Sequence, residues 1–156
     1  MICPAGSIVH IEKFVLRDGS SRNKFFIVLN VDKDNCLTLL SMTTSNESGF
    51  YFSIDDIEIK HGGIKDTKGK IFMYCIPKGL VIGINKGFKF TKDTFFLAQY
   101  SFIELDSEQM TKYPIKILDE ISKEELNNLV YTLYCSPYIK KNFKQKLEKI
   151  LTALNS

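Results

Sequence analysis

The chain of 156 residues has no tryptophan and only four prolines, nine glycines and two histidines. It also lacks any run of about 18 apolar residues, which an ordinary membrane-spanning helix requires. The segment MICPAGSIVH at its start has no cationic stretch followed by an apolar one, the pattern of a secretory signal. These absences exclude the common membrane and secreted classes, and they predict a cytoplasmic protein with no membrane partner.

Closely spaced metal and redox motifs are also missing. The four cysteines, Cys3, Cys36, Cys75 and Cys135, include no CxxC pair, and the two histidines lie far apart in the sequence. Zinc sites and thiol redox sites normally show such short spacings. We therefore expect reduced, mostly buried thiols, and neither a metal site nor a bound cofactor.

What the chain does contain is typical of one globular domain. Hydrophobic residues make up 44% and charged residues 25%, both near the average for soluble proteins. The twelve phenylalanines and seven tyrosines favour a β-rich core, because aromatic side chains pack well on pleated surfaces. The length predicts a single domain that spans residues 1–156.

Apolar segments of strand length occur along the first two thirds of the chain. The predicted strands are residues 7–14, 24–31, 36–44, 50–60, 70–76, 80–84 and 94–105. Residues 24–31 are almost continuously apolar, and Asp34-Asn35 predicts the turn of a hairpin with residues 36–44. Many strands with short connections indicate an antiparallel sheet curled into a small barrel, at about residues 5–106.

The last third of the chain has helical spacing, at about residues 119–154. Ser122 and Glu125 fit a capping box, in which Ser122 accepts the amide hydrogen of Glu125 and Glu125 reaches back. A first helix should follow, and Pro137 suits the first position of a second one. The sequence thus predicts an α+β protein, with a small antiparallel β-barrel followed by two C-terminal helices.

The net charge of +3 conceals an uneven distribution. Residues 60–92 hold eight lysines and one acid, which gives this segment +7 and leaves −4 for the rest. Its first five lysines are the candidate RNA-binding residues: Lys60, Lys65, Lys68, Lys70 and Lys78. A solvated surface that keeps the protein soluble explains the same pattern equally well. Four aromatic residues lie among the lysines, and we expect each to belong to the core rather than to stack on bases: Phe72, Tyr74, Phe88 and Phe90.

Four short motifs, in their order along the chain, resemble the PemK/MazF-like toxins. They are Gly6-Ser7-Ile8-Val9, Lys24-Phe25-Phe26-Ile27-Val28-Leu29, Leu39-Leu40-Ser41-Met42-Thr43-Thr44-Ser45 and Phe96-Leu97-Ala98-Gln99. The resemblance covers about residues 5–45 and 94–106. It implies an SH3-like barrel that forms a homodimer, cleaves single-stranded RNA without a metal, and is inhibited by a small acidic antitoxin.

The resemblance also implies a reaction, in which a 2′-hydroxyl attacks the adjacent phosphodiester and leaves a cyclic phosphate. Such chemistry needs proton transfer and positive charge near the phosphate. The family's catalytic arginine falls on Lys24, with Arg22 as a substitute, and its threonine or serine falls on Thr43. Lysine neutralises a phosphate but lacks the guanidinium fork. A non-catalytic SH3-like module that binds RNA or protein is therefore the alternative, and a protein whose amphipathic helices dock on a partner is a third.

The two histidines are weaker candidates. His10 lies on the first predicted strand, where a histidine can serve as an acid or base, but we interpret it as an ordinary strand residue. His61 precedes two glycines, and we interpret it as a loop residue within the basic segment.

Overall fold

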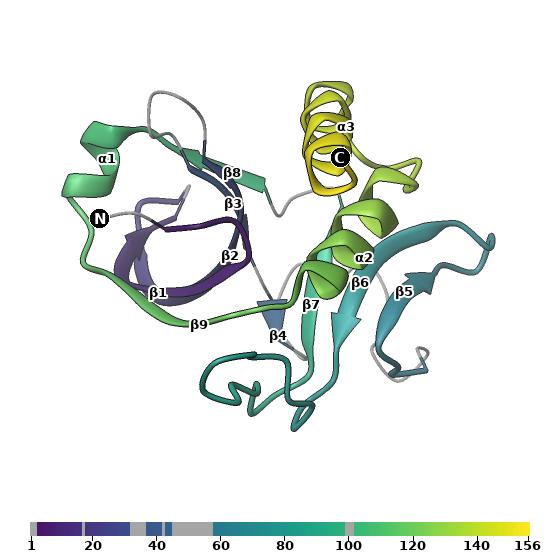
Figure 1. Ribbon diagram of the computed structural model, residues 1–156, viewed down its shortest axis with the longest axis horizontal. Coiled ribbons are helices and arrows are strands. Elements are labelled where there is room, and N and C mark those ends of the chain that lie inside the picture. Colours follow the sequence, from purple (N-terminus) through teal and green to yellow (C-terminus); the bar gives the residue numbers. More distant parts are fainter. Residues whose placement is uncertain (1–2, 17, 32–36, 42, 45–57, 99–101) are drawn as a thin grey trace.

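The computed structural model of the chain describes all residues except 1–2, 17, 32–36, 42, 45–57 and 99–101 (Figure 1). In the described part, two antiparallel sheets and three helices are present. The α+β class predicted from the sequence is confirmed.

The first sheet contains strands from both ends of the β-rich region, in the order β8-β3-β2-β1-β9. Their bounds are Ser7–Val15 for β1, Ser21–Val31 for β2, Leu37–Ser41 for β3, Phe102–Leu105 for β8 and Ile115–Glu120 for β9. The sheet curls strongly (Figure 1). Both faces of β2 are buried, because Phe26 and Val28 join one apolar cluster while Ile27 and Leu29 join another. This explains why the β2 sequence is almost continuously apolar.

The second sheet is smaller and has the order β4-β7-β6-β5. Its strands are β4 at Thr43–Thr44, β5 at Gly62–Lys65, β6 at Ile71–Ile76 and β7 at Thr94–Leu97. A tight turn joins β5 to β6, where Asp66 accepts hydrogen bonds from the amides of Lys68 and Lys70. The hydroxyl of Tyr138 also donates to Asp66 and fixes this turn to the segment between the two C-terminal helices.

Three helices complete the described fold: α1 at Ser107–Thr111, α2 at Lys123–Tyr134 and α3 at Lys141–Leu154. Helix α2 packs on β5, β6 and α3 (Figure 1). The largest apolar cluster joins both sheets to α2 and α3, and α2 contributes Leu126, Leu129, Val130 and Leu133 to it. Each such buried side chain contributes roughly 2 kcal/mol of hydrophobic stabilisation. Within the described residues, no helix is long and apolar enough to cross a membrane.

The predicted single barrel is wrong. The described strands form two sheets, and within them no pairing joins β8 to β9, so the first sheet stays open. Residues 94–105, predicted as one strand, contribute β7 to the second sheet and β8 to the first. Residues 80–84 make only isolated bridges, and β9 had no prediction. The turn at Asp34-Asn35 and most of the predicted strand 50–60 lie outside the described residues, but β2 and β3 do pair as predicted.

The two C-terminal helices are present, but each differs from its prediction in one detail. Ser122 caps α2 and accepts the amide hydrogen of Glu125 at 3.0 Å. The Glu125 side chain does not reach back to Ser122, because it points toward the second sheet instead. Helix α3 begins at Lys141 rather than at Pro137, since the intervening residues form a turn in which Ser136 accepts the amide of Tyr138.

Candidate functional site

The three residues singled out from the sequence lie at one end of the β2–β3 pair. Lys24 is in β2 opposite Ile11 of β1, and β3 pairs with β2 only as far as Phe26, which lies opposite Ser41. Thr43 follows Ser41 by two residues and pairs with Phe95 of β7. Lys24 and Thr43 therefore flank the step where the chain passes from the first sheet to the second.

Arg22 lies farther from this step. It pairs with Phe14 on β1 and is exposed, whereas Lys24 is half-buried. Arg22 and Lys24 share a face of β2, because side chains alternate along a strand. The structure therefore places two cations on one face, with Lys24 nearer to β4.

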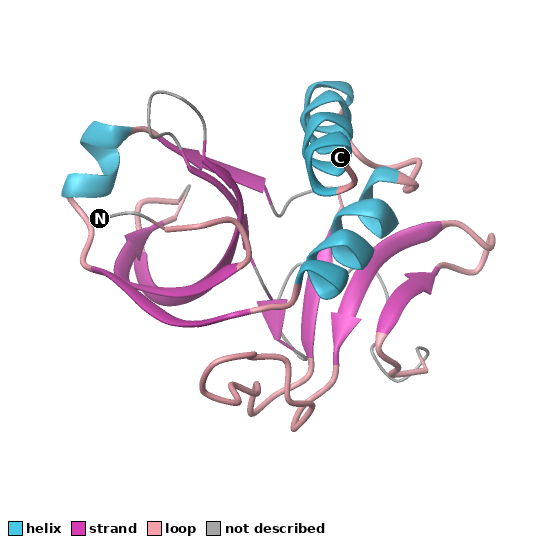
Figure 2. Cartoon of the chain, in the orientation of Figure 1, coloured by secondary structure: helices cyan, strands magenta, loops and turns pink. Residues whose placement is uncertain are grey.

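The long connection between β6 and β7, residues 77–93, folds back on itself, and we call it the arm. Hydrogen bonds from Gly79 to Phe90 and from Ile82 to Phe88 hold its two sides together. It reaches from the base of the second sheet toward β9 (Figure 2). The arm leads directly into Thr94, which pairs with Thr44 of β4. It carries four exposed lysines: Lys78, Lys86, Lys89 and Lys92.

A buried carboxylate on β9 anchors the tip of the arm. Asp119 is 4% exposed, and its Oδ2 accepts the amides of Lys86 at 2.9 Å and Phe88 at 3.1 Å. Its Oδ1 accepts the amides of Asn85 at 3.0 Å and Glu120 at 2.7 Å. Burial alone would raise the pKa of Asp119, but these four backbone donors outweigh it and hold the pKa at about 2. The carboxylate is therefore ionised at neutral pH and fixes the shape of the basic arm.

The tip also requires a glycine at position 83. A Cβ atom there would lie 1.9 Å from Asp119 Oδ2 and 2.6 Å from the backbone nitrogen of Phe88. Backbone atoms cannot move aside as the end of a flexible side chain can. Gly83 thus allows the arm to approach β9 closely enough for the Asp119 hydrogen bonds to form.

Aromatic rings connect the arm to β2. Phe25 is 38% exposed, and the centre of its ring lies 4.9 Å from His10, 6.3 Å from Phe88 and 6.2 Å from Phe90. Phe90 is buried and Phe88 is half-buried. Tyr74 is buried too, so the core interpretation of the aromatic residues is confirmed for Phe90 and Tyr74. Phe25, which the sequence interpretation did not consider for stacking, is the most exposed ring of this group.

The predicted RNA-binding lysines are all exposed, but they do not form one patch. Lys65, Lys68 and Lys70 surround the β5–β6 turn, whereas Lys60 and Lys78 lie at the opposite end of these strands. The six residues of β6 separate the two groups by about 20 Å. The backbone amide of Lys78 donates to Asp93 at the base of the arm. Lys78 therefore belongs with the other lysines of the arm.

A second polar cluster joins His61, the residue before β5, to β6 and α2. Glu125 is buried, and its Oε1 lies 2.6 Å from His61 Nε2 while its Oε2 accepts the Tyr74 hydroxyl at 2.8 Å. Burial, reinforced by the Glu125 charge, raises the pKa of Tyr74. From the sequence we expected a capping role for Glu125 and a loop position for His61, and no pattern indicated that the two residues meet. Since all three polar groups satisfy one another, we interpret the cluster as a clamp that holds α2 on the sheet.

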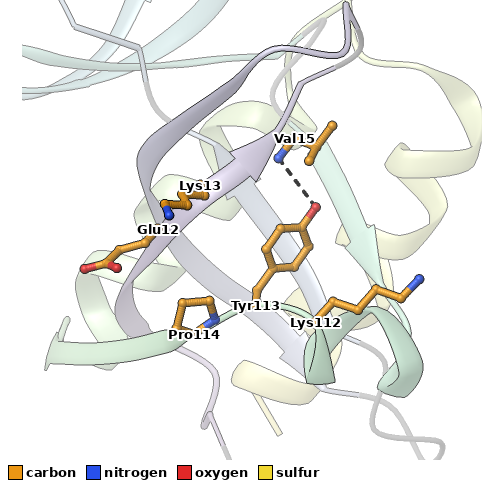
Figure 3. A pocket seen from close by; sticks show the side chains of 6 residues that line it. All are labelled: Glu12, Lys13, Val15, Lys112, Tyr113 and Pro114. Atoms are coloured by element: carbon orange, nitrogen blue, oxygen red, sulfur yellow. Dashed lines mark hydrogen bonds between the residues drawn. The ribbon is translucent and has the colours of Figure 1, made fainter.

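A surface pocket of about 390 Å³ lies beside the bulge of β1 (Figure 3). Its lining residues are Glu12, Lys13, Val15, Lys112, Tyr113 and Pro114. Lys13 has a left-handed backbone, with φ of 53°, and its amide donates to Asn23. The Val15 amide donates to the Tyr113 hydroxyl oxygen. None of the candidate residues from the sequence lines this pocket.

Together, the fold and the site define an α+β protein with a basic and aromatic surface at the junction of two antiparallel sheets. Comparison of the chain with protein-family models, curated proteins and solved structures finds no match.

Proposed function

We propose that the protein is a metal-independent endoribonuclease that cleaves single-stranded RNA by attack of a 2′-hydroxyl, similar to the PemK/MazF-like toxins. The observation that carries the proposal is the arrangement of three segments near the sheet junction. Lys24 lies where the β2–β3 pair ends, and Thr43 lies in β4, two residues after β3 ends. The arm contacts the opposite face of β2 through Phe25, the neighbour of Lys24. These segments supply a cation, a hydroxyl residue and a group of arm lysines beside the same strand.

In this proposal, Lys24 stabilises the charge that develops on the phosphate in the transition state, and Arg22 adds a second cation on the same face. Thr43 binds the phosphate. A lysine acts as a point charge, so it provides electrostatic stabilisation without the two parallel hydrogen bonds of arginine. The four exposed lysines of the arm compensate in part for the missing hydrogen bonds, because their combined field attracts the RNA backbone.

The proposal extends to the fold and the partners. It does not include a closed SH3-like barrel, because the first sheet stays open within the described residues; the curled sheet that carries Lys24 on β2 would take the place of that barrel. A homodimer would place a groove between two such sheets. A small acidic antitoxin would have charge opposite to that of the arm, and we propose that it inhibits the nuclease by covering the lysines.

The test is cleavage of single-stranded RNA in the presence of a metal chelator. We expect products with 2′,3′-cyclic phosphate and 5′-hydroxyl ends. Replacing both Lys24 and Arg22 by alanine should lower the rate by at least about 100-fold, the usual cost of removing transition-state charge stabilisation. Replacing Lys141 and Lys149 instead removes the same charge from helix α3, and this control should keep most of the activity.

Each other outcome has a defined meaning. Wild-type rates in the Lys24→Ala, Arg22→Ala variant would reject this site. Binding of RNA without any cleavage by the wild-type protein would reject the nuclease and favour the non-catalytic binding module.

A further inference from the structure

We propose that the exposed ring of Phe25, supported by His10, Phe88 and Phe90, is a base-stacking subsite for single-stranded RNA. We call these four residues the aromatic shelf. The inference rests on the proposed function for its choice of RNA as the ligand, and it adds a binding subsite beside the cleavage site.

The shelf presents one ring to solvent and holds it from beneath. Phe25 is 38% exposed, whereas Phe90 is only 5% exposed and meets Phe25 edge-on, at 6.2 Å and 82°. Phe88 packs against Phe90 at 5.0 Å and 88°. Isolated exposed aromatic residues are common, but here two chain segments, β2 and the arm, keep the exposed ring in place. A ring that is already fixed loses little conformational entropy when a base stacks on it.

Cations flank the shelf. Lys89 lies between Phe88 and Phe90 in the arm, and Lys116 of β9 lies opposite His10 in the sheet register. Both lysines are exposed. An acid is also present nearby, since Glu12 follows His10 by two residues and shares its face of β1. The cations still predominate, and a flat apolar ring between lysines complements a base with phosphates on either side.

The shelf and the proposed cleavage residue are on opposite faces of β2. Side chains alternate along the strand, so Phe25 points away from Lys24. Because β3 pairs with β2 only as far as Phe26, both residues lie where β3 has already left the pair. RNA that passes this end of β2 can place a base on Phe25 and a phosphate near Lys24. The shelf therefore binds a base that flanks the scissile phosphate, and substitutions there should raise KM more than they lower kcat.

The absence of tryptophan from the chain provides a direct test. Phe25→Trp creates a single fluorescent indole on the shelf, and stacking of a base should quench its emission. The probe is a short mixed-sequence RNA with a 2′-O-methyl group on every nucleotide, which binds but has no attacking hydroxyl. Tyr131→Trp, at a 57% exposed position on α2, is the matched control and should stay unquenched.

The affinity of the protein for the 2′-O-methyl RNA provides a second test. Phe25→Leu keeps an apolar side chain but removes the ring, and it should weaken binding of the 2′-O-methyl RNA by at least about fivefold, the lower end of base-stacking effects. Phe25→Tyr keeps the ring and should bind as the wild type does. Urea unfolding of the three proteins shows whether a weaker affinity reflects lost stacking or lost folding.

Several results would overturn the inference. RNA binding that leaves the indole at position 25 unquenched would do so, as would equal affinity of the wild type and Phe25→Leu. Quenching by an acidic peptide but not by RNA would assign the surface to a protein partner. Quenching without cleavage of unmodified RNA would keep the shelf and reject the nuclease, whereas cleavage without quenching would do the reverse.

Discussion

Replacing Asp119 by asparagine should release the tip of the arm from β9. The carboxylate accepts four backbone amide hydrogens, and asparagine offers a single acceptor oxygen in their place. Its NH₂ group would face the amides of Lys86 and Phe88, which both donate. Each lost hydrogen bond costs about 1 kcal/mol where water can partly replace it, so the total loss is about 2 kcal/mol.

The lowered pKa of Asp119 gives a second value for the contribution of this carboxylate to folding stability. Burial raises this pKa, yet the four amide donors lower it further, from the ordinary 3.8 to about 2. At 1.36 kcal/mol per pKa unit, that difference corresponds to about 2 kcal/mol of folding stability. Because the folded-state pKa is the lower one, this contribution is fully present well above pH 3.8 and is lost as the pH falls toward 2.

The assay is urea unfolding of the wild type and Asp119→Asn over this pH range. The wild type should be more stable by about 2 kcal/mol at neutral pH, and the difference should shrink toward zero near pH 2. Asp93→Asn, which changes an acid that accepts the Lys78 amide, is the control and should cost about 1 kcal/mol or less. Amide hydrogen exchange should become faster at Asn85, Lys86 and Phe88. A difference that is the same at both ends of the pH range would refute the reasoning.

Two further substitutions test the packing that holds the site. Gly83→Ala should destabilise the protein by about 3 kcal/mol, because the new Cβ would collide with Asp119 and with backbone. Gly69→Ala has open space and only a left-handed φ of 76°, so it should cost about 1 kcal/mol by the same unfolding measurement. Glu125→Ala should lower the stability by about 2 kcal/mol, since it leaves the buried Tyr74 hydroxyl without its acceptor and removes the partner of His61. The exposed neighbour Glu124→Ala should change it by less than about 0.5 kcal/mol, and equal effects of the two would contradict the clamp.

The sequence correctly predicted those elements that are determined by residues close together in the chain. The β2–β3 pair and the α2 cap follow from an apolar run and from Ser122, and both are present. The prediction of a barrel was wrong because the sheet to which a strand belongs depends on its pairing with strands far away in the sequence. Residues 94–105 look like one strand, yet their two halves pair with β4 and β6 in one sheet and with β3 in the other.

The candidate site was predictable only in part, for the same reason. Lys24 and Thr43 could be named from motifs, and register places both at one end of the β2–β3 pair. The role of Phe25 depends on the arm, whose tip is held by Asp119, 33 residues after Lys86 in the chain. No spacing pattern in the sequence indicates that Asp119 contacts the arm.

The charge of the arm offers a physical reason why a lysine at position 24 suffices in the proposed site. A guanidinium binds a phosphate through directed hydrogen bonds that persist in salt, whereas a point charge acts with its neighbours through a screened field. Four arm lysines against one acid, Asp93, place a net +3 beside the junction. Cleavage should therefore fall steeply with added salt, and Lys86→Ala with Lys89→Ala should make that fall shallower by about two fewer counterions released. If the salt dependence stayed unchanged in that variant, the arm would have no part in binding RNA.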